Sequence, residues 1–375
     1  MNFTLTPAQQ EFQRRVASFA RHRIEPAVPE MEATGRPPAE LIADMGAQGF
    51  MQVRLPGSNP PGLNHLDQTL LLEALSRHSA AVGLLMVSQL MGIGTLMEFA
   101  GPVVREQYLP RLTSGEMLLA LGITEPSGGS DPGAAATRAE RDGDSFLLTG
   151  RKVFITNSHW AGLALVVART SSDPRRGLSV FAVDTASPGF RTGRAEHKTG
   201  LKGCVTGELV LDQCRVPASH LLGEEGDGLA ITIKAISEYG RMGNAGVALG
   251  LMQAVFEETQ ALAAAVGQLH QPLVREGLAA IYGETQAARL LTYQAAWLLD
   301  TGARADAEVA TTKFFANDAS LRCVRRAMAI AGSRGLVAGH PLERCFRDAI
   351  PLISADGTGD IQRIVAARSL VGRFS

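Results

Sequence analysis

The chain has 375 residues, of which 45% are hydrophobic and 19% are charged, with a formal net charge of -1 and a pI of about 6.7. This composition excludes a disordered protein and leaves enough apolar residues for about two or three domains with cores of their own. Nucleic acid is not an expected partner, because proteins that bind phosphate backbones usually carry a surplus of basic residues.

The N-terminus has no basic stretch followed by an apolar segment, so no secretion signal is expected and the predicted location is the cytoplasm. The four cysteines form no Cys-x-x-Cys pair and have no histidine at zinc-ligand spacing. They are Cys204, Cys214, Cys323 and Cys345. We expect them to be free thiols in a reducing compartment.

Helices are predicted over the first third of the chain. Thr6 and Pro7 provide a cap and a proline in the first turn, and Phe12, Val16 and Phe19 then recur on one helical face.

The segment from Ser79 to Met97 is uncharged and long enough to cross a membrane. It contains several glycines, and charged residues lie close to both of its ends. Both features favour a buried helix of a soluble protein, so no membrane association is expected. Upstream of it, Asn59-Pro60-Pro61-Gly62 predicts a loop.

The pattern changes near residue 118, where short β-type runs follow one another. Turn sequences separate them, including Asp142-Gly143-Asp144 and Ser187-Pro188-Gly189. The runs are Phe146 to Thr149, Val153 to Thr156, Ala164 to Ala168, Ser179 to Val183 and Leu209 to Leu211. No long helix intervenes, so an antiparallel sheet or barrel is predicted rather than a parallel one.

From about Gly223 the helical period returns and lasts to the end, for example in the alanine-rich stretch from Ala279 to Leu299. The chain is therefore predicted to be an α+β protein with three domains. These are a helical domain over 1-117, a β domain over 118-222 and a helical domain over 223-375.

Two segments of the β region are candidates for ligand binding. Residues 121–131 (LGITEPSGGSD) can bring backbone N–H groups close to an anionic or planar ligand, although the same residue types also make ordinary surface turns. Residues 152–157 (KVFITN) combine an aromatic ring with a threonine and could wall a flat cofactor, or form a plain strand over a core. Neither segment contains a P-loop or a G-x-G-x-x-G motif.

A third candidate lies near the C-terminus, in residues 354–362 (SADGTGDIQ). Asp360 is predicted to cap the last helix, and the Gly-Thr-Gly before it leaves N–H groups free for a polar ligand. Asp356 is a candidate general base, with an ordinary Asp-Gly turn as the alternative. The histidines match no metal-binding spacing and no serine lies in a G-x-S-x-G elbow, so metal catalysis is not expected.

Together these segments resemble the acyl-CoA dehydrogenase family of flavoproteins along essentially the whole chain. The shared motifs, in family order, are Leu5-Thr6-Pro7, Tyr108-Leu109-Pro110, Ser114-Gly115-Glu116, Ile123-Thr124-Glu125-Pro126, Gly129-Ser130-Asp131, Ile155-Thr156-Asn157, Leu222-Gly223-Glu224-Glu225-Gly226, Arg347-Asp348-Ala349 and Gly357-Thr358. The resemblance implies an N-terminal helical domain, a central antiparallel β domain and a C-terminal four-helix bundle. It also implies FAD between the β domain and the C-terminal helices.

The resemblance assigns roles to single residues. Those expected to contact FAD are Leu121, Ile123, Thr124, Gly129, Ser130, Phe154, Ile155, Thr156 and Thr358. Those expected to bind substrate are Ser130, Arg241 and Gly357. The family reaction removes a proton from Cα and passes a hydride from Cβ to flavin N5, and Asp356 matches the position of the base. A carboxylate shielded from water has the raised pKa that suits this role, provided that the enolate oxygen is stabilised.

The base itself departs from the family pattern. Most relatives carry glutamate where this chain has Asp356, which is one methylene shorter. Misplacing a base by about 1 Å costs on the order of a hundredfold in rate, so substrate or loop must lie closer. The family's alternative glutamate position is Gly240 here, so no second carboxylate replaces it.

A second departure concerns the contact by which a neighbouring subunit holds the FAD pyrophosphate. The usual arginine and phenylalanine are replaced by Val266 and Leu269, and a usual glutamine by Ala329. Losing the arginine removes a bidentate phosphate contact. We therefore expect weaker FAD binding or an altered dimer contact, unless Arg334 substitutes.

The sequence thus predicts FAD-dependent α,β-dehydrogenation of an acyl thioester carried by CoA or by an acyl carrier protein, as in specialised biosynthesis. An electron-transfer flavoprotein or another acceptor is the expected partner, and a homodimer or homotetramer the expected assembly. Met86, Leu90 and Met91 either make the acyl pocket shallow or belong to the core. Two alternatives stay open. One is a flavin oxidase or monooxygenase, since an aspartate base resembles that of nitroalkane oxidase, and the other is a non-catalytic relative without flavin.

Overall fold

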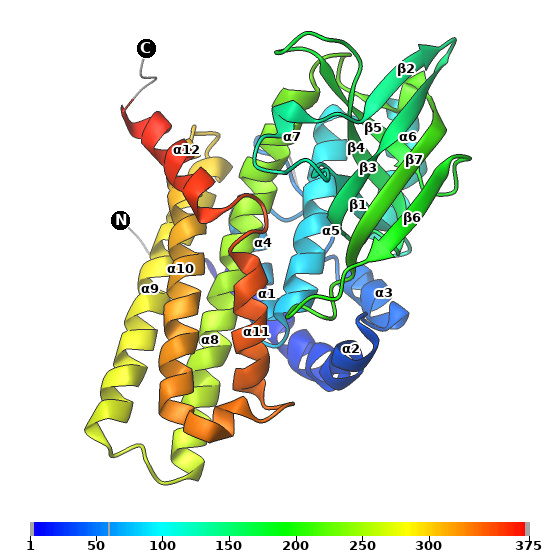
Figure 1. Cartoon of the computed structure of the whole chain (residues 1–375). Helices are drawn as coiled ribbons and strands as arrows, with labels where there is room; N and C mark the ends of the chain where they lie inside the picture. Colours follow the sequence, from blue (N-terminus) through cyan, green and yellow to red (C-terminus); the bar gives the residue numbers. More distant parts are fainter. Residues whose placement is uncertain (1–3, 59–60, 372–375) are drawn as a thin grey trace.

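The structure of the protein, a computed structural model, describes residues 4–58 and 61–371. Asn59 and Pro60 of the predicted loop lie outside the described residues. Helices come first, strands follow and helices return, as Figure 1 shows. This order confirms the predicted succession of helical, β and helical parts.

The N-terminal part is helical from residue 7 to residue 113. It consists of α1 (Pro7–Phe19), a π-helical turn η1 (Ala20–Ile24), a 3-10 turn η2 (Glu25–Ala27), α2 (Val28–Thr34), α3 (Ala39–Ala47), α4 (His65–Ser76), α5 (Ala80–Phe99) and α6 (Pro102–Thr113). The predicted start of the first helix is confirmed, because the Thr6 hydroxyl accepts a hydrogen bond from the Gln9 N–H and Pro7 is the first helical residue.

The central part is one mixed sheet. Its strands are β1 (Leu118–Gly122), β2 (Arg138–Asp142), β3 (Ser145–Thr156), β4 (Ala161–Arg169), β5 (Leu178–Asp184), β6 (Phe190–Ala195), β7 (Thr206–Pro217) and β8 (Leu221–Leu222), with 3-10 turns η3 (Pro132–Ala134) and η4 (Ala218–His220). The strand order is β6-β7-β3-β2-β4-β5-β8, and β1 joins the sheet at β4.

Most strand pairs are antiparallel, as expected, but β1 and β2 each pair with β4 in parallel. A parallel pair needs a long connection between its strands. The segment that contains β2 and β3 provides that connection between β1 and β4. The antiparallel prediction therefore holds for most pairs and misses the two parallel ones.

The C-terminal part is helical again. It consists of α7 (Gly228–Ala235), a π-helix η5 (Ile236–Arg241), α8 (Met242–Ala265), α9 (Pro272–Asp300), α10 (Asp306–Ala331), a 3-10 turn η6 (Gly332–Leu336), α11 (Pro341–Leu352) and α12 (Gly359–Val371). Helices α8 to α11 run side by side as a bundle, and α12 follows at one end of α10 (Figure 1).

Helix α5 joins the three parts. It is long and apolar enough to cross a membrane by length and composition, but 89% of its most apolar window is buried within the fold. At Gly92 a Cβ atom would lie 2.0 Å from Leu119 Cδ2, so only glycine allows α5 to approach β1 this closely. Gln89 fixes the same contact by accepting a hydrogen bond from the Leu119 N–H at 2.9 Å. The segment is therefore a core helix, as predicted.

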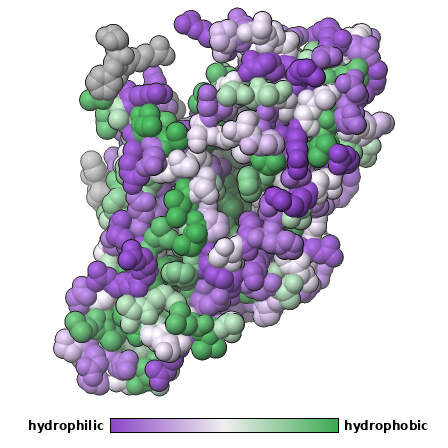
Figure 2. Space-filling model, in the orientation of Figure 1, coloured by the Kyte–Doolittle hydropathy of each residue, from purple (hydrophilic) through white to green (hydrophobic). Residues whose placement is uncertain are grey.

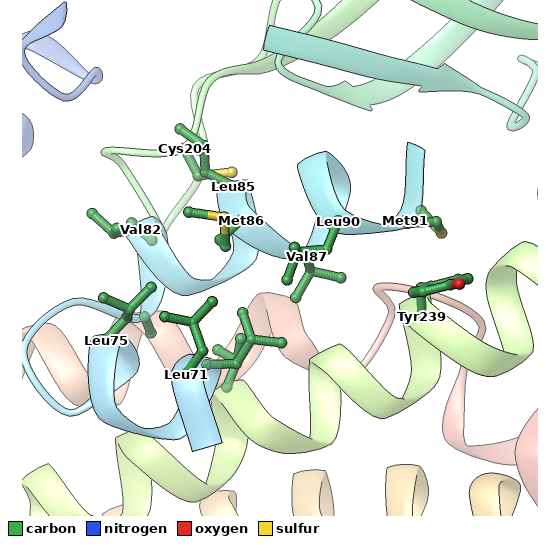
Figure 3. Packing of buried hydrophobic residues seen from close by; sticks show 14 of the residues in the cluster. Leu71, Leu75, Val82, Leu85, Met86, Val87, Leu90, Met91, Cys204 and Tyr239 are labelled. Carbon is green, nitrogen blue, oxygen red and sulfur yellow. The ribbon is translucent and has the colours of Figure 1, made fainter. Parts of the chain in front are cut away.

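The main apolar core lies between α4, α5 and α8 (Figure 3). Figure 3 shows Leu75 of α4 near Val82 of α5 and Leu71 beside Leu75, with Met91 and Tyr239 at the other end of α5. The four cysteines are buried and unpaired.

Candidate active site

The site is built around Asp356, in the loop between α11 and α12. Its backbone φ is 55°, in the left-handed region that non-glycine residues seldom adopt, and Gly357 follows with a φ of 93°. The Asp356 Oδ2 atom is buried and has no hydrogen-bond partner. A strained residue that holds a buried, unpartnered carboxylate oxygen is typical of a functional loop rather than of a plain turn.

The Asp356 carboxylate faces a glycine of the π-helix η5. A Cβ atom added at Gly240 would lie 2.8 Å from Asp356 Oδ1 and 3.1 Å from its Cγ, and 3.3 Å from Met91 Sδ. A π-helical turn within a longer helix is often found at functional sites. Gly240 thus leaves room for the carboxylate, and Met91 of α5 borders the same space.

Two cationic side chains and an amide surround the Asp356 carboxylate. Burial raises the pKa of Asp356, whereas the Lys313 ammonium, the Asn244 amide and the Arg241 guanidinium oppose that rise. Arg241 is half-buried, and its Nε atom has no hydrogen-bond partner. The predicted substrate-binding residue Arg241 therefore lies near the predicted base, on the last turn of η5.

The backbone of the same loop offers free donors. Among the residues that the structure describes, the N–H groups of Asp356 and Gly357 donate to no protein acceptor. Two neighbouring free N–H groups beside a carboxylate are suited to hold an oxygen that becomes negative during a reaction.

On the sheet side, Phe154 projects from a bulge in β3. The register between β3 and β7 shifts between Lys152 and Ile155, and Phe154 has a φ of 57°. The residue is 63% exposed, which is unusual for a phenylalanine inside a strand. A bulge with a left-handed residue turns a side chain out of the normal alternation. The ring therefore lies on the surface, available to a flat ligand.

The glycine-rich loop after β1 lies beside this bulge. The Thr124 carbonyl accepts a hydrogen bond from the Val153 N–H at 2.9 Å. Glu125 and Gly128 exchange two backbone hydrogen bonds, at 3.1 and 2.9 Å, so the loop folds back on itself. A Cβ atom at Gly129 would lie 2.9 Å from the Thr124 hydroxyl oxygen. The loop therefore brings Thr124 and Gly129 together and leaves the following Ser130 exposed.

A buried ion pair supports this loop from behind. Lys152 Nζ lies 2.7 Å from Glu125 Oε1, and the two side chains are 0% and 5% exposed. Glu125 also accepts hydrogen bonds from the Thr137 hydroxyl at 2.6 Å and from the Ala136 N–H at 2.7 Å. Burial alone would raise the pKa of Glu125, but Lys152, Thr137 and Ala136 together lower it to about 2. The pair is therefore ionised and fixes the loop on β3.

The other residues on the sheet side that are predicted to contact FAD are less exposed than Phe154. Leu121 and Ile123 are partly buried and pack against the main core. Ile155 is 3% exposed and belongs to the core of the sheet, so only its backbone can face a ligand. Thr156 is half-buried and lies beside the Cys204 thiol.

At the other side of the site, Thr358 begins the last helix. Its hydroxyl accepts a hydrogen bond from the Ile361 N–H at 3.4 Å, and α12 starts at Gly359. The predicted cap at Asp360 is therefore wrong by two positions, because Asp360 lies inside the first turn and pairs with Arg363 at 3.2 Å. Thr358 thus has a structural role in addition to its predicted contact with FAD.

Tyr239 closes the space next to Met91 (Figure 3). A Cβ atom at Gly94 would lie 2.3 Å from Tyr239 Cζ and 2.6 Å from its hydroxyl oxygen, so the ring occupies the place of a side chain on α5. The ring is 5% exposed. Of the three apolar residues predicted for an acyl pocket, Met86 and Leu90 are core residues and Met91 reaches the neighbourhood of the base.

The two sides of the site face each other across a depression. Figure 2 shows the surface hollowed between the sheet and the C-terminal helices, and in Figure 1 the loop between α11 and α12 faces the β part of the molecule. Helix α5 lies between them, because it packs against β1 at Gly92 and its Met91 borders the space beside Gly240 that the Asp356 carboxylate faces.

The residues that replace the expected FAD contact from a neighbouring subunit lie on the C-terminal bundle. Val266 follows the end of α8, and Leu269 lies partly exposed in the turn before α9. Ala329 lines a groove of about 690 Å³ between α9 and α10, together with Arg325 and Arg326. Arg334 is exposed in η6.

Comparison with known proteins gives the family. Residues 6–116, 120–214 and 226–371 match the sequence models of the N-terminal, middle and C-terminal domains of acyl-CoA dehydrogenases. The chain belongs to the acyl-CoA dehydrogenase family. An acyl-CoA dehydrogenase of Bacillus subtilis (strain 168) is 36% identical over 376 residues, covering 98% of this chain and 99% of the relative.

Solved structures of acyl-CoA dehydrogenases have the same fold. Butyryl-CoA dehydrogenase from Megasphaera elsdenii superimposes with a TM-score of 0.93 at 30% identity, over 99% of this chain and 100% of that one. A glutaryl-CoA dehydrogenase from Mycobacterium smegmatis in complex with FADH2 has a TM-score of 0.92 at 25% identity, over 99% of this chain and 96% of that one.

Sequence reasoning did not find several residues that shape the site of this acyl-CoA dehydrogenase family member. They are Lys313, Asn317, Gln362, Asn244 and Tyr239. The signal for the first two was present, because Lys313 and Asn317 lie one turn apart on the buried alanine face of α10. A lysine on such a face needs buried partners.

Proposed function

We propose that the protein oxidises an acyl thioester to its α,β-unsaturated product, with Asp356 as the base and FAD as the cofactor. The observation that carries the proposal is the Asp356 carboxylate, whose Oδ2 atom is buried without a partner while Gly240 leaves space beside Oδ1. Burial raises the pKa of Asp356, which strengthens it as a base near neutral pH.

Asp356 would take the proton from Cα of the thioester. That proton is acidic enough to remove only if the oxygen of the resulting enolate is stabilised where its charge develops. The free N–H groups of Asp356 and Gly357 are the donors that the loop offers for this oxygen. Arg241, close to the same carboxylate, contributes positive charge to the site.

The residues on the sheet side fit a flavin. The exposed Phe154 ring gives a flat apolar surface, and the missing side chain at Gly129 allows close approach to the loop. When bound, FAD supplies the acceptor for the hydride from Cβ. The residues that would hold it are Leu121, Ile123, Thr124, Gly129, Ser130, Phe154, Ile155 through its backbone, Thr156 and Thr358.

The acyl group is proposed to be short or compact. Tyr239 fills the space beside Gly94, and Met91 borders the space in front of Asp356. Both side chains are buried, and we propose that they limit the room beyond the reacting carbons. The likeness to a butyryl-CoA dehydrogenase supports the same size range.

CoA or an acyl carrier protein would carry the acyl group, and the CoA substrates named for the structural relatives favour CoA. An electron-transfer flavoprotein is the proposed electron acceptor, and a homodimer or homotetramer the proposed assembly. Both rest on membership of the family.

The test is a visible absorption spectrum of the purified protein, followed by anaerobic addition of butyryl-CoA. Bleaching of the flavin bands by butyryl-CoA, and its loss in Asp356→Asn with FAD still bound, is the expected result. General base catalysis contributes on the order of a hundred- to ten-thousandfold, so the rate of bleaching should fall by at least about a hundredfold in the variant.

Two results would overturn the proposal. A wild-type protein that binds no FAD even when it is added would indicate a non-catalytic relative, as the replaced residues Val266 and Ala329 would allow. Turnover that consumes oxygen without any external acceptor would indicate a flavin oxidase or monooxygenase instead.

A further inference from the structure

The base loop is held by a buried lysine. Lys313 of α10 is 0% exposed, and its ammonium donates hydrogen bonds to the carbonyl oxygens of Gly357 at 2.6 Å and Ile353 at 3.1 Å. These two residues lie on either side of Asp356 in the loop. A single ammonium therefore ties the beginning of the loop to its end.

Two further buried side chains hold neighbouring parts of the same backbone. Asn317, one turn after Lys313, donates to the Leu352 carbonyl at 2.7 Å, and Gln362 of α12 donates to the Asp356 carbonyl at 3.1 Å. Such contacts are needed because an aspartate in the left-handed region costs on the order of 1 kcal/mol unless its surroundings fix it there. Of the three anchors, only Lys313 carries a charge.

The charge of Lys313 acts on Asp356 as well as on the backbone. Burial lowers the pKa of Lys313 to about 8, and the Asp356 carboxylate opposes that shift. The lysine is therefore still mainly charged at neutral pH. The other charged groups that face it are Arg241 of η5 and Asp318 of α10, and Asp318 is paired with Arg363 of α12. Asp356 itself is faced by Lys313, Arg241 and the neutral amide of Asn244.

We propose that Lys313 is a positioning residue for the reaction: it fixes the loop that carries Asp356 and keeps the Asp356 carboxylate ionised although its Oδ2 atom is buried. The inference rests on the proposed function of Asp356 as base. The simpler reading is that Lys313 only caps the C-terminal end of α11, where lysines often bind free carbonyls. The two explanations differ in what they predict for variants without the lysine charge: only the first predicts that the acid limb of the pH–activity profile moves.

The experiment compares the pH dependence of kcat/KM for butyryl-CoA in the FAD-loaded wild type, Lys313→Gln, Lys313→Met and Asn317→Ala. The Asn317→Ala variant is the matched control, since it removes a neutral anchor of the same loop one turn away. FAD content and thermal midpoint are recorded for each variant, so that loss of fold is seen separately from loss of rate.

Removing an opposite charge near a carboxylate raises the carboxylate pKa, typically by about one unit or more. We therefore expect the acid limb of the profile to move up by about one pH unit in both neutral lysine variants. Their rate at pH 7 should fall at least about tenfold and recover in part at higher pH. In Asn317→Ala the limb should stay at the wild-type pH.

An unmoved acid limb in a neutral variant that binds FAD would overturn the inference, as would an equal shift in Asn317→Ala. Should neither neutral variant hold FAD, Lys313→Arg takes their place. If the acid limb of the Lys313→Arg profile moves although the positive charge is kept, the inference is contradicted. If the acid limb stays at the wild-type pH while kcat falls, the inference is supported. A wild-type enzyme that does not oxidise thioesters would instead refute the proposed function itself.

Discussion

Replacing Gly240 by alanine tests whether the base needs the empty space opposite it. The new methyl carbon would lie 2.8 Å from Asp356 Oδ1 and 3.1 Å from Cγ. Favourable C–H···O contacts have carbon–oxygen distances of about 3.3–3.6 Å, so the carboxylate would have to move by at least about 0.5 Å. A displacement of about 1 Å at a reacting group costs on the order of a hundredfold. We expect kcat to fall by about ten- to a hundredfold, which corresponds to roughly 1.4–2.7 kcal/mol in the barrier.

The assay is the anaerobic rate of flavin reduction by butyryl-CoA, with FAD content measured on the same samples. Gly283→Ala is the matched control, because Gly283 lies in α9 and an added Cβ there would meet nothing within 4 Å. Adding Gly240→Ala to Asp356→Asn should cost little further rate, since both changes act on one group. A Gly240→Ala enzyme with full FAD content and the wild-type rate would refute the claim that the Asp356 carboxylate needs the space that Gly240 of η5 leaves free.

Three further predictions follow from the same structure. Tyr239→Ala should raise the rate with octanoyl-CoA relative to butyryl-CoA by about tenfold or more, because it removes the ring proposed to close the acyl pocket. Tyr239→Phe keeps the ring and should keep the wild-type ratio of the two rates. An unchanged ratio in the alanine variant would contradict the assignment of Tyr239 to the acyl pocket. Lys152→Met should lower the free energy of unfolding by about 3–5 kcal/mol in urea titrations, since it leaves the Glu125 carboxylate buried without its cation. Glu125→Gln in the same chain should restore part of that loss. A change below about 1 kcal/mol in Lys152→Met would show that the ion pair is not needed for stability. Burial raises the pKa of Asp348 from 3.8 to about 6, so the native state binds more protons than the unfolded state between about pH 4 and pH 6. The free energy of unfolding therefore falls as the pH rises through that window. Asp348→Asn should remove about 3 kcal/mol of that fall, and the same pH slope in the variant and the wild type would argue against a protonated Asp348.

The order of helices and strands was predictable because each part has a clear hydrophobic period. The strands that were missed lack one. β2 (RAERD) and β6 (FRTGRA) are mostly charged or polar, and both are largely exposed. β1 (LLALG) is apolar on both faces, since Leu119 belongs to the main core on the side of α5 and Ala120 to the core of the sheet, and it therefore shows no alternation.

The candidate site was predictable where a residue type signals its chemistry and not where only space matters. The aspartate before Gly-Thr made Asp356 the predicted base, which stays a prediction, and the structure places this residue in a loop with a left-handed backbone. No sequence pattern indicates that the absent side chains of Gly240 and Gly94 make room for Asp356 and for Tyr239. Such contacts join residues that are more than a hundred positions apart, so no local pattern contains them.

The same spatial argument explains why the most membrane-like segment of the chain is an internal helix. α5 packs against β1 at Gly92 and against α8 at Val87, and its Met91 borders the space beside Gly240, so no face is left for charge along most of its length. Its side chains set the distance between the sheet, where a flavin would lie, and the carboxylate of Asp356. A catalytic site divided between two domains needs a rigid spacer, and close-packed apolar helices provide one because their contacts cannot relax gradually. The hydrophobicity of α5 is therefore a requirement of the site as well as of the core.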